Sequence, residues 1–476
     1  MEGFPMHPLK HLRCLALVLI SPFAVGETLS QIYEQAVEHD PQLRAAQAAY
    51  RADSEAKNIG RAGLLPQITA RGEYEELESD GANTTVLGQG AVFGREGHTD
   101  TDTKGYSISL TQPIFDLPAW FTFQQGKALS EQARLQFAAD QQLLILRTAD
   151  AYFEVLRARE NLETALAEQK AIQRQLEQTT ERFEVGLLPI TDVHEAQAAF
   201  DSAKVNTLEI RGALDIAFEG LTVLTGQRYE QLAGLMPDFP IVDPQPLSRE
   251  DWVQFALQNN FTLQATRYQR DAAEENADSK KYEHAPTLSG SISYFDDQSK
   301  SEFRGRDISD PPNPYYVSPS ETKQDGHVVG LQLTIPIFTG GLISAERRQA
   351  FHQSVEAKEI FTGAQRNTVQ QARSQHLSVL TDKARVNARN QAITSAASAL
   401  EATQAGYDAG TRNIVDVLLA QQNLYQARRD YANARFDYIG SLLRLKEVAG
   451  QLSPEDIYQL NAWLDPAINV TKAGVR

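Results

Sequence analysis

The stretch Glu401–Ala420 decides the fold, and it reads Glu-Ala-Thr-Gln-Ala-Gly-Tyr-Asp-Ala-Gly-Thr-Arg-Asn-Ile-Val-Asp-Val-Leu-Leu-Ala. Gly406 and Gly410 interrupt a long helical pattern, and either Thr411 or Asn413 can then cap a new helix. The new helix would carry three apolar residues on one side: Ile414, Val417 and Leu418. The stretch therefore predicts the end of an antiparallel helical hairpin.

A second stretch, upstream in the chain, repeats this pattern. Phe183-Glu184-Val185-Gly186 leads through Pro189 into Ile190-Thr191-Asp192-Val193. Three pairs of positions match: Gly186 with Gly410, Ile190 with Ile414, and Asp192 with Asp416. We therefore expect two hairpin ends in one chain, each bearing a carboxylate at the same place.

The whole chain repeats one pattern in tandem. Pro113-Ile-Phe115 is copied as Pro336-Ile-Phe338, and Gly226-Gln227 is copied as Gly450-Gln451. A nearly constant internal spacing of this kind indicates repeated structural units. We expect four segments in the mature chain: a first repeat at 27–226, a proline-rich linker at 227–247, a second repeat at 248–450 and a C-terminal segment at 451–476.

Each repeat has the same predicted order of helix, strand, polar loop, strand, long helix, hairpin end and returning helix. The strands alternate apolar and polar residues, and the long helices lack proline and are rich in Ala, Gln, Glu and Leu. The strands are expected at about 67–75, 106–115, 287–295 and 328–338, and the hairpin ends at about 184–191 and 406–412. Exposed loops are expected at 76–104 and 296–326, and a loose end beyond Pro466.

The first 26 residues have the pattern of an export signal. Lys10, His11 and Arg13 precede the apolar run Cys14–Ile20, and Ala24-Val25-Gly26 offers small residues for cleavage. A membrane anchor is the rival interpretation, but the apolar run is too short to cross a bilayer. Cleavage would leave a mature chain without cysteine, and therefore without disulfides or cysteine-ligated metal.

Charge and motif content exclude several classes of function. The formal net charge of −17 argues against a nucleic-acid partner, because little in such a chain would neutralise phosphates. His194-Glu195 lacks the second histidine of a metalloprotease helix, and no nucleophile with a matching base stands out. The sequence predicts no enzyme activity, no cofactor and no metal site. It also contains no phosphate-binding loop, so transport energy would have to come from a partner.

The predicted strands suggest a barrel that several chains share. Each strand has one apolar and one polar face, and its length fits a transmembrane strand of about 9–11 residues. Four strands cannot close a barrel alone, and eight would leave an interior filled by side chains. Three chains would supply twelve strands. The alternative is a soluble helical protein carrying two hairpins.

The sequence resembles the TolC-type outer-membrane efflux channels, the outer membrane factor family, over essentially all of the mature chain. The resemblance is carried by Leu64-Leu65-Pro66-Gln67, by Thr111-Gln112-Pro113-Ile114-Phe115, by Val185-Gly186 with Ile190–Val193, and by Gly406-Tyr407 with Gly410–Leu418. It implies an α+β membrane protein: a homotrimer with one twelve-stranded β-barrel, four strands per chain, continued by a long α-helical coiled-coil barrel in the periplasm.

The resemblance also implies function and partners. The chain would be the outer-membrane exit duct of a tripartite efflux pump or a type I secretion system. It would be recruited by a periplasmic adaptor protein and an inner-membrane RND or ABC transporter. A second hypothesis is an outer-membrane anchored structural or adhesive stalk without conductance, and a third is a soluble secreted enzyme.

Roles for particular residues follow from the same resemblance. Asp192 would accept a hydrogen bond from Tyr407, and Arg412 would reach the Thr191/Asp192 region of a neighbouring chain, which together would hold the duct closed. The other implied residues are Asp416 as a ring at the aperture, and Gly186, Pro189 and Gly410 at adaptor-facing ends. Leu419 stands where the family would have a second aspartate. The plainer alternative is that these are capping and solvated residues.

Overall fold

The computed structural model describes residues 26–87, 91–307 and 314–472. The chain divides into two compact units. The first, which we call the helical unit, takes its described residues from the chain up to Arg44, from Gln141–Trp252 and from Ala372 onward. The second, the strand unit, comprises Ala45–Asp140 and Val253–Gln371. The predicted export signal falls outside the described residues except for Gly26.

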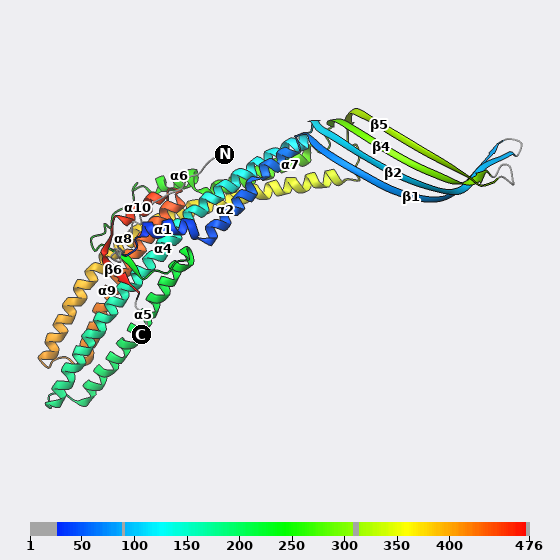
Figure 1. Cartoon of the computed structure of the whole chain (residues 1–476). Coiled ribbons are helices and arrows are strands. Elements are labelled where there is room, and N and C mark those ends of the chain that lie inside the picture. The colour runs from blue at the N-terminus through cyan, green and yellow to red at the C-terminus, as the bar shows by residue number, and fades with distance from the viewer. Residues whose placement is uncertain (1–25, 88–90, 308–313, 473–476) are drawn as a thin grey trace, which may run out of the picture. The chain divides into compact units, whose positions relative to one another are not determined.

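Two very long helices contribute to both units. These are α4, Leu117–Glu184, and α8, Leu342–Asp408, with 68 and 67 residues. At about 1.5 Å per residue each is roughly 100 Å long. After the hairpin ends the chain returns in α5, Ile190–Thr225, and α9, Ile414–Val448 (Figure 1). Within the described residues, no helix is both long enough and apolar enough to cross a membrane.

The strand unit contains one antiparallel sheet in the order β1-β2-β4-β5. Its strands are β1, Gln67–Leu87, β2, Ala91–Phe115, β4, Thr287–Asp307, and β5, Tyr316–Thr334. One row of residues crosses all four strands as Ile68, Leu110, Ile292 and Val329. Figure 1 shows the four strands as one curved ribbon. Long helices together with strands are the fold class that the sequence predicted, and that prediction is confirmed.

The extent of the strands corrects the prediction. Most of the expected loops at 76–104 and 296–326 belong to the sheet, where Glu76 pairs with Asp102, Asp102 with Lys300, and Lys300 with Glu321. The backbone forms the ladder hydrogen bonds whatever the side chains are, so a polar composition does not end a strand. The expected strand at 328–338 instead ends at Thr334, before Pro336, which has no N–H to donate.

The same face of the sheet changes character along the strands. It begins with the apolar row of Ile68, Leu110, Ile292 and Val329, and eight residues farther along each strand it carries the charged row of Glu76, Asp102, Lys300 and Glu321. Between the two rows lie Tyr74, Tyr106 and Tyr294, and the rings of the last two are 6.2 Å apart. The strands predicted from the sequence correspond to the apolar part only.

Helices of the strand unit pack side by side at one end of the sheet, where the strands meet α4 and α8. They are α2, Pro41–Ser54, α3, Ala56–Ala62, α7, Phe261–Lys281, and the adjoining parts of α4 and α8. Tyr50 stacks on Phe137 at 5.4 Å, and Phe121 stacks on Tyr282 at 5.1 Å. A Cβ on Gly60 would come within 2.8 Å of the Thr122 carbonyl oxygen, so α3 and α4 approach each other where only glycine fits.

The helical unit has a small core beside its long helices. It includes α1, Leu29–His39, the start of α6, Arg249–Asn259, as far as Trp252, then α10, Pro454–Asn461, and a two-stranded sheet of β3, Gln231–Leu235, and β6, Leu464–Thr471. The sheet corrects two predictions, because β3 lies in the expected linker and β6 covers the end that was expected to be loose. Leu232 is fully buried, and the Tyr152 hydroxyl donates to the Ala233 carbonyl at 2.6 Å. These contacts come from residues far away in the sequence.

Candidate functional site at the hairpin ends

The first hairpin end is a tight helix termination followed by an open turn. Gly186 has φ of 79°, and its N–H donates to the Phe183 carbonyl at 2.8 Å. The N–H of Leu187 donates to the Arg182 carbonyl at 2.9 Å. This left-handed termination is the glycine-dependent motif that the sequence predicted. Val185 and Leu187 are 71% and 72% exposed, so this end leaves apolar surface open in the single chain.

The second hairpin end uses the same backbone turn with a side-chain cap. Gly410 has φ of 74°, and the N–H of Thr411 donates to the Gly406 carbonyl at 2.8 Å. The Asn413 side-chain oxygen accepts from the Asp416 N–H at 2.8 Å. Of the two predicted caps, Asn413 is therefore the one that starts α9.

The two ends meet in one apolar cluster. Tyr407 is 6% exposed, and Ile414 and Val417 are fully buried beside it. Partly buried apolar residues complete the cluster: Leu188 from the first end, and Leu400 and Leu418 from the second. The first hairpin end thus covers the base of the second, which places the predicted gate residues of both repeats at the same end of the helical unit.

Tyr407 has an unusual environment for a tyrosine. Its hydroxyl is buried and has no hydrogen-bond partner among the described residues. The Arg182 guanidinium lies 5.3 Å from the ring centroid and forms an ion pair with Asp408 at 2.9 Å. The hydrogen bond to Asp408 is the main reason that the pKa of Arg182 is raised. Sequence reasoning missed Arg182, although a basic residue in the last turn of a helix is a recognisable signal.

The remaining predicted gate residues make contacts within their own hairpin ends. The Thr191 hydroxyl lies 3.4 Å from the Asp192 carboxylate, and Arg412 forms an ion pair with Asp416 at 3.7 Å. The Arg412 side chain remains 61% exposed. The structure does not join Asp192 to Tyr407 within the described part of this chain. The contact between these two residues, and that of Arg412 with a neighbouring chain, stay predictions.

Asp416 and Leu419 lie in the first two turns of α9. The Asp416 side chain is 36% exposed in its pair with Arg412. Leu419 is 53% exposed and lines a cavity of about 620 Å³ between α4, α5 and α9. The position where the family resemblance leads one to expect a second carboxylate is therefore an accessible apolar surface.

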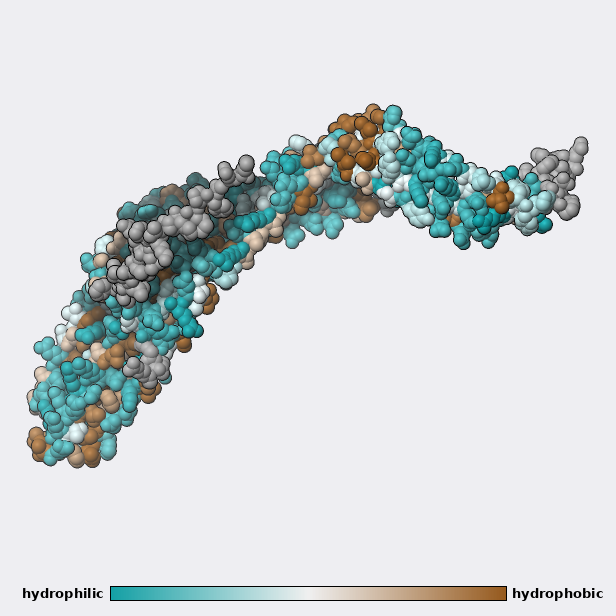
Figure 2. Space-filling view, in the orientation of Figure 1, coloured by the Kyte–Doolittle hydropathy of each residue, from teal (hydrophilic) through white to brown (hydrophobic). Residues whose placement is uncertain are grey.

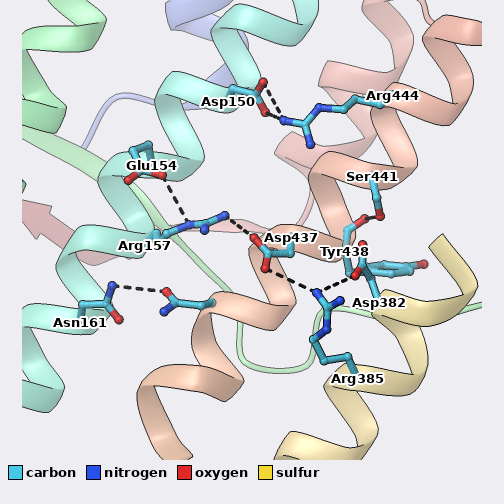
Figure 3. Close-up of polar contacts among 11 residues, drawn as sticks. Asp150, Glu154, Arg157, Asn161, Asp382, Arg385, Asp437, Tyr438, Ser441 and Arg444 are labelled. Carbon is cyan, nitrogen blue, oxygen red and sulfur yellow. Dashed lines mark hydrogen bonds and ion pairs between the residues drawn. The ribbon is translucent and has the colours of Figure 1, made fainter. Parts of the chain in front are cut away.

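A network of polar contacts holds α9 between α4 and α8 farther from the hairpin ends (Figure 3). Asp437 accepts from Arg157 of α4 at 2.8 Å and lies 3.9 Å from Arg385 of α8. The pairs on either side are Arg444 with Asp150 at 3.2 Å, Asn161 with Asn433 at 3.3 Å, Arg389 with Asp430 at 2.9 Å and Arg429 with Glu168 at 2.6 Å. Three helices are thus connected through one carboxylate and its neighbours.

Sequence reasoning also missed this network. A signal does exist, because Asp430, Asp437 and Arg444 repeat every seven residues and so share one side of α9. Isolated charge repeats usually mark a solvated helix face, however. The pairing partners on α4 lie nearly three hundred residues away from them in the chain, and only the folded structure identifies them.

Comparison with known proteins identifies the family. The model described as "Outer membrane efflux protein" matches residues 32–227 and 252–451, which is most of the chain in two segments. The chain belongs to this family. The resemblance inferred from the motifs is therefore confirmed. Like its relatives, this protein belongs to the outer membrane.

Relatives match this outer membrane efflux protein over nearly its whole length. Outer membrane protein TolC of Vibrio cholerae is 37% identical over 95% of this chain and 97% of the relative. TolC of Escherichia coli is 34% identical over 97% of this chain and 90% of the relative. The alkaline protease secretion protein AprF of Pseudomonas aeruginosa is 30% identical over 93% of this chain and 88% of the relative.

Solved structures support the fold. The outer membrane protein VceC of Vibrio cholerae superimposes with a TM-score of 0.69 at 20% identity, covering 89% of this chain and 96% of VceC. The CmeC outer membrane channel of Campylobacter jejuni also gives 0.69, at 16% identity, covering 92% of this chain and 90% of CmeC. At such identities the likeness concerns the fold of this outer membrane efflux protein alone.

Proposed function

We propose that this outer membrane efflux protein is a passive exit duct, through which drugs or secreted proteins leave the periplasm for the exterior. Family membership supports efflux, and the names of relatives such as alkaline protease secretion protein AprF and proteases secretion protein PrtF support secretion. The single observation that carries the proposal is the sheet of the strand unit. Its lipid-compatible face is bounded by two strands that have no partner on their outer edge among the described residues.

The apolar face of the sheet matches the hydrocarbon of a bilayer. Ile68, Val329 and Leu331 are 68%, 69% and 75% exposed in the single chain. Along the strands, the apolar row is followed by tyrosines and then by the charged row. This is the order expected where a strand leaves a membrane, because aromatic side chains occupy the interface. We propose that the apolar part of each strand crosses the outer membrane and that the charged part extends beyond it.

The open edges of the sheet favour a shared barrel. β1 and β5 are the edge strands, and each unpaired backbone group in hydrocarbon costs several kcal/mol. Pairing β5 of one copy with β1 of the next satisfies these groups. Three copies give a homotrimer with a twelve-stranded barrel, wide enough for an open lumen. The two segments matched by the family model support the division into repeats at 27–226 and 248–450, with β3 in the stretch between them at 227–247.

We further propose that the hairpin ends form the gate of the duct. The buried Tyr407 hydroxyl lacks a partner among the described residues, and Asp192 would supply an acceptor for it in the closed gate. Arg412 is exposed enough to leave Asp416 for the Thr191/Asp192 region of a neighbour. Exposed pairs contribute about 0–1 kcal/mol each. In three copies these pairs sum to a few kcal/mol. Binding of a partner could overcome that, because about 5.5 kcal/mol shifts a two-state equilibrium from 1:99 to 99:1.

Asp416 and Leu419 would set the character of the aperture. Three copies of Asp416 form a carboxylate ring that raises the local concentration of cations. Leu419 supplies an apolar ring one turn farther into α9, so block by multivalent cations is weaker than two acidic rings would give. Gly186, Pro189 and Gly410 would face the periplasmic adaptor.

The duct would act with partners that supply energy. We propose a periplasmic adaptor and an inner-membrane RND or ABC transporter, while the chain itself works without cofactor or enzyme activity. The order of events is pump-driven loading, opening of the hairpin ends and passive passage to the exterior. A non-conducting stalk would not need a gate at the end of its helices.

Planar-bilayer recording tests the proposal. The purified trimer should show discrete conductance, and Tyr407→Phe combined with Arg412→Ser should raise that conductance and increase antibiotic leakage in cells. Absence of conductance even in the double variant would favour the stalk. Conductance that is unchanged by the double variant would keep the duct and remove these two residues from the gate.

A further inference from the structure

A cleft between α7 and α8 lies just below the sheet and has no role in the duct or its gate. It has a volume of about 670 Å³, within the range of roughly 300–1,000 Å³ typical of small-ligand sites. Its basic residues are Lys281, Arg347 and Arg348, and its walls include Phe351, Glu274 and Asp278. The two helices are joined by an ion pair of Lys280 with Glu346 at 2.9 Å.

The charges in the cleft do not balance. Lys281 pairs with Asp278 at 3.4 Å, and Glu274 lies 3.9 Å from Arg270. Arg347 and Arg348 are exposed and take part in no ion pair or side-chain hydrogen bond among the described residues. Two neighbouring guanidinium groups therefore remain uncompensated, and planar guanidinium groups are suited to bidentate contact with phosphate.

The cleft is at the depth of lipid headgroups if the sheet crosses the membrane. Arg347 lies five residues after the start of α8, about 8 Å along the helix. The headgroup layer on each side of a bilayer is roughly 5–8 Å thick. Lys281 ends α7 shortly before β4 begins at Thr287. Both helices thus present their cations within two turns of the helix ends that lead to the sheet.

Apolar and aromatic residues connect the sheet to the cleft. Ile337 and Phe338, between β5 and α8, are 89% and 84% exposed, and Leu342 at the start of α8 is 59% exposed. Trp120, 48% exposed, lies at the same end of α4. Figure 2 shows hydrophobic residues gathered where the strands meet the helices. Such a belt beside cations is the arrangement that holds acyl chains and headgroups together.

We propose that this cleft binds the phosphate of an anionic phospholipid from the periplasmic leaflet of the outer membrane. Arg347 and Arg348 hold the phosphate, Lys281 adds a third cation at the rim, and the acyl chains run along Ile337 and Phe338 toward the apolar strands. The proposal rests on the membrane-crossing sheet of the proposed function. It assigns to α7 and α8 a second task, which is to fix the depth of the duct in the membrane.

Native mass spectrometry in detergent tests the site with phosphatidylglycerol as the probe and phosphatidylcholine as the comparison. Arg347→Gln combined with Arg348→Gln should lower the affinity for phosphatidylglycerol about thirtyfold, the factor for two basic residues at about 1 kcal/mol each. The control is Lys358→Gln combined with Arg366→Gln, which removes the same charge from exposed positions of α8 outside the cleft. It should leave binding unchanged.

Three outcomes would overturn the proposal: equal losses in the two double variants, equal affinity of the wild type for both lipids, or displacement of phosphatidylglycerol by inorganic phosphate at similar concentration. The last would mean a phosphate site without lipid. If the arginine variant does not assemble, photo-crosslinking of wild-type protein with a headgroup-labelled phosphatidylglycerol decides, because the labelled peptides must include residues 274–281 or 347–354. Conductance measured on the same samples separates failure of the lipid site from failure of the duct.

Discussion

The two hairpin ends share a sequence pattern and a backbone turn, yet their surroundings differ. Gly186 and Gly410 have φ values of 79° and 74°. Ile190 of the first end is 45% exposed, whereas the matching Ile414 of the second is fully buried. Leu188 of the first end packs on the cluster around Ile414, and no equivalent cover lies over Ile190 within the described chain. One end therefore acts as a cover and the other as a core.

This difference teaches how a duplicated chain acquires distinct parts. The turn is encoded locally by glycine and a cap, so both copies reproduce it. Burial depends on what lies opposite: Leu188 of the first end covers the cluster around Ile414, whereas Ile190 stays 45% exposed. The second end has the buried Tyr407, the asparagine cap and the paired Arg412, while the first has exposed apolar side chains in the single chain.

The largest expected contrast comes from truncating the matching isoleucines. Ile414→Ala should lower the free energy of opening of the α8–α9 end by about 2–4 kcal/mol, because it leaves a cavity in the cluster. Ile190→Ala should cost less than about 1 kcal/mol. Hydrogen exchange at the amides of both ends measures the two values. Equal losses would mean that the ends are equally buried, contrary to the structure.

The glycines should instead respond alike. Gly186→Ala and Gly410→Ala each place a Cβ at positive φ, with an expected cost of about 1–2 kcal/mol in the same hydrogen-exchange experiment. Neither position has an atom within 4 Å of the added Cβ, so backbone strain is the whole effect. Gly212→Ala, in open space within helix α5, is the control and should not destabilise its helix. A large difference between the two turn glycines would contradict a shared turn geometry.

The cap at the second end should have a smaller effect. Asn413→Ala removes the acceptor for the Asp416 N–H and should lower the free energy of opening of that end by about 1 kcal/mol. Asn413→Asp keeps an acceptor and should retain stability. If alanine and aspartate behave alike, the side chain of Asn413 does not cap α9 in solution.

The smallest change in stability is expected from Tyr407→Phe. The hydroxyl has no partner among the described residues, so its loss should alter the free energy of opening within the isolated chain by under about 0.5 kcal/mol. In the assembled protein the same variant should raise conductance, because the closed gate would lose the hydrogen bond to Asp192. A loss of stability in the monomeric state would place the missing partner within the chain.

Much of the candidate site could be predicted from the sequence because it rests on local signals. Gly186 and Gly410 mark helix ends, and Asn413 stands where a cap is required. Arg182 and the contacts of Arg412 and Asp416 were not predicted from physical patterns, because exposed charges on helices have many possible partners. The network around Asp437 was missed for the same reason, since its partners Arg157 and Arg385 come from two other helices.

The sequence by itself determined the two repeats, the long proline-free helices, the hairpin ends and the apolar part of each strand. All of these depend on periodicity and on residues close together in the chain. Only the tertiary structure decided how far the sheet continues past Glu76 and Lys300, that β3 pairs with β6, and which hairpin end is buried. The physical reason is that backbone pairing and burial are properties of the opposing surface, and that surface comes from distant parts of the chain.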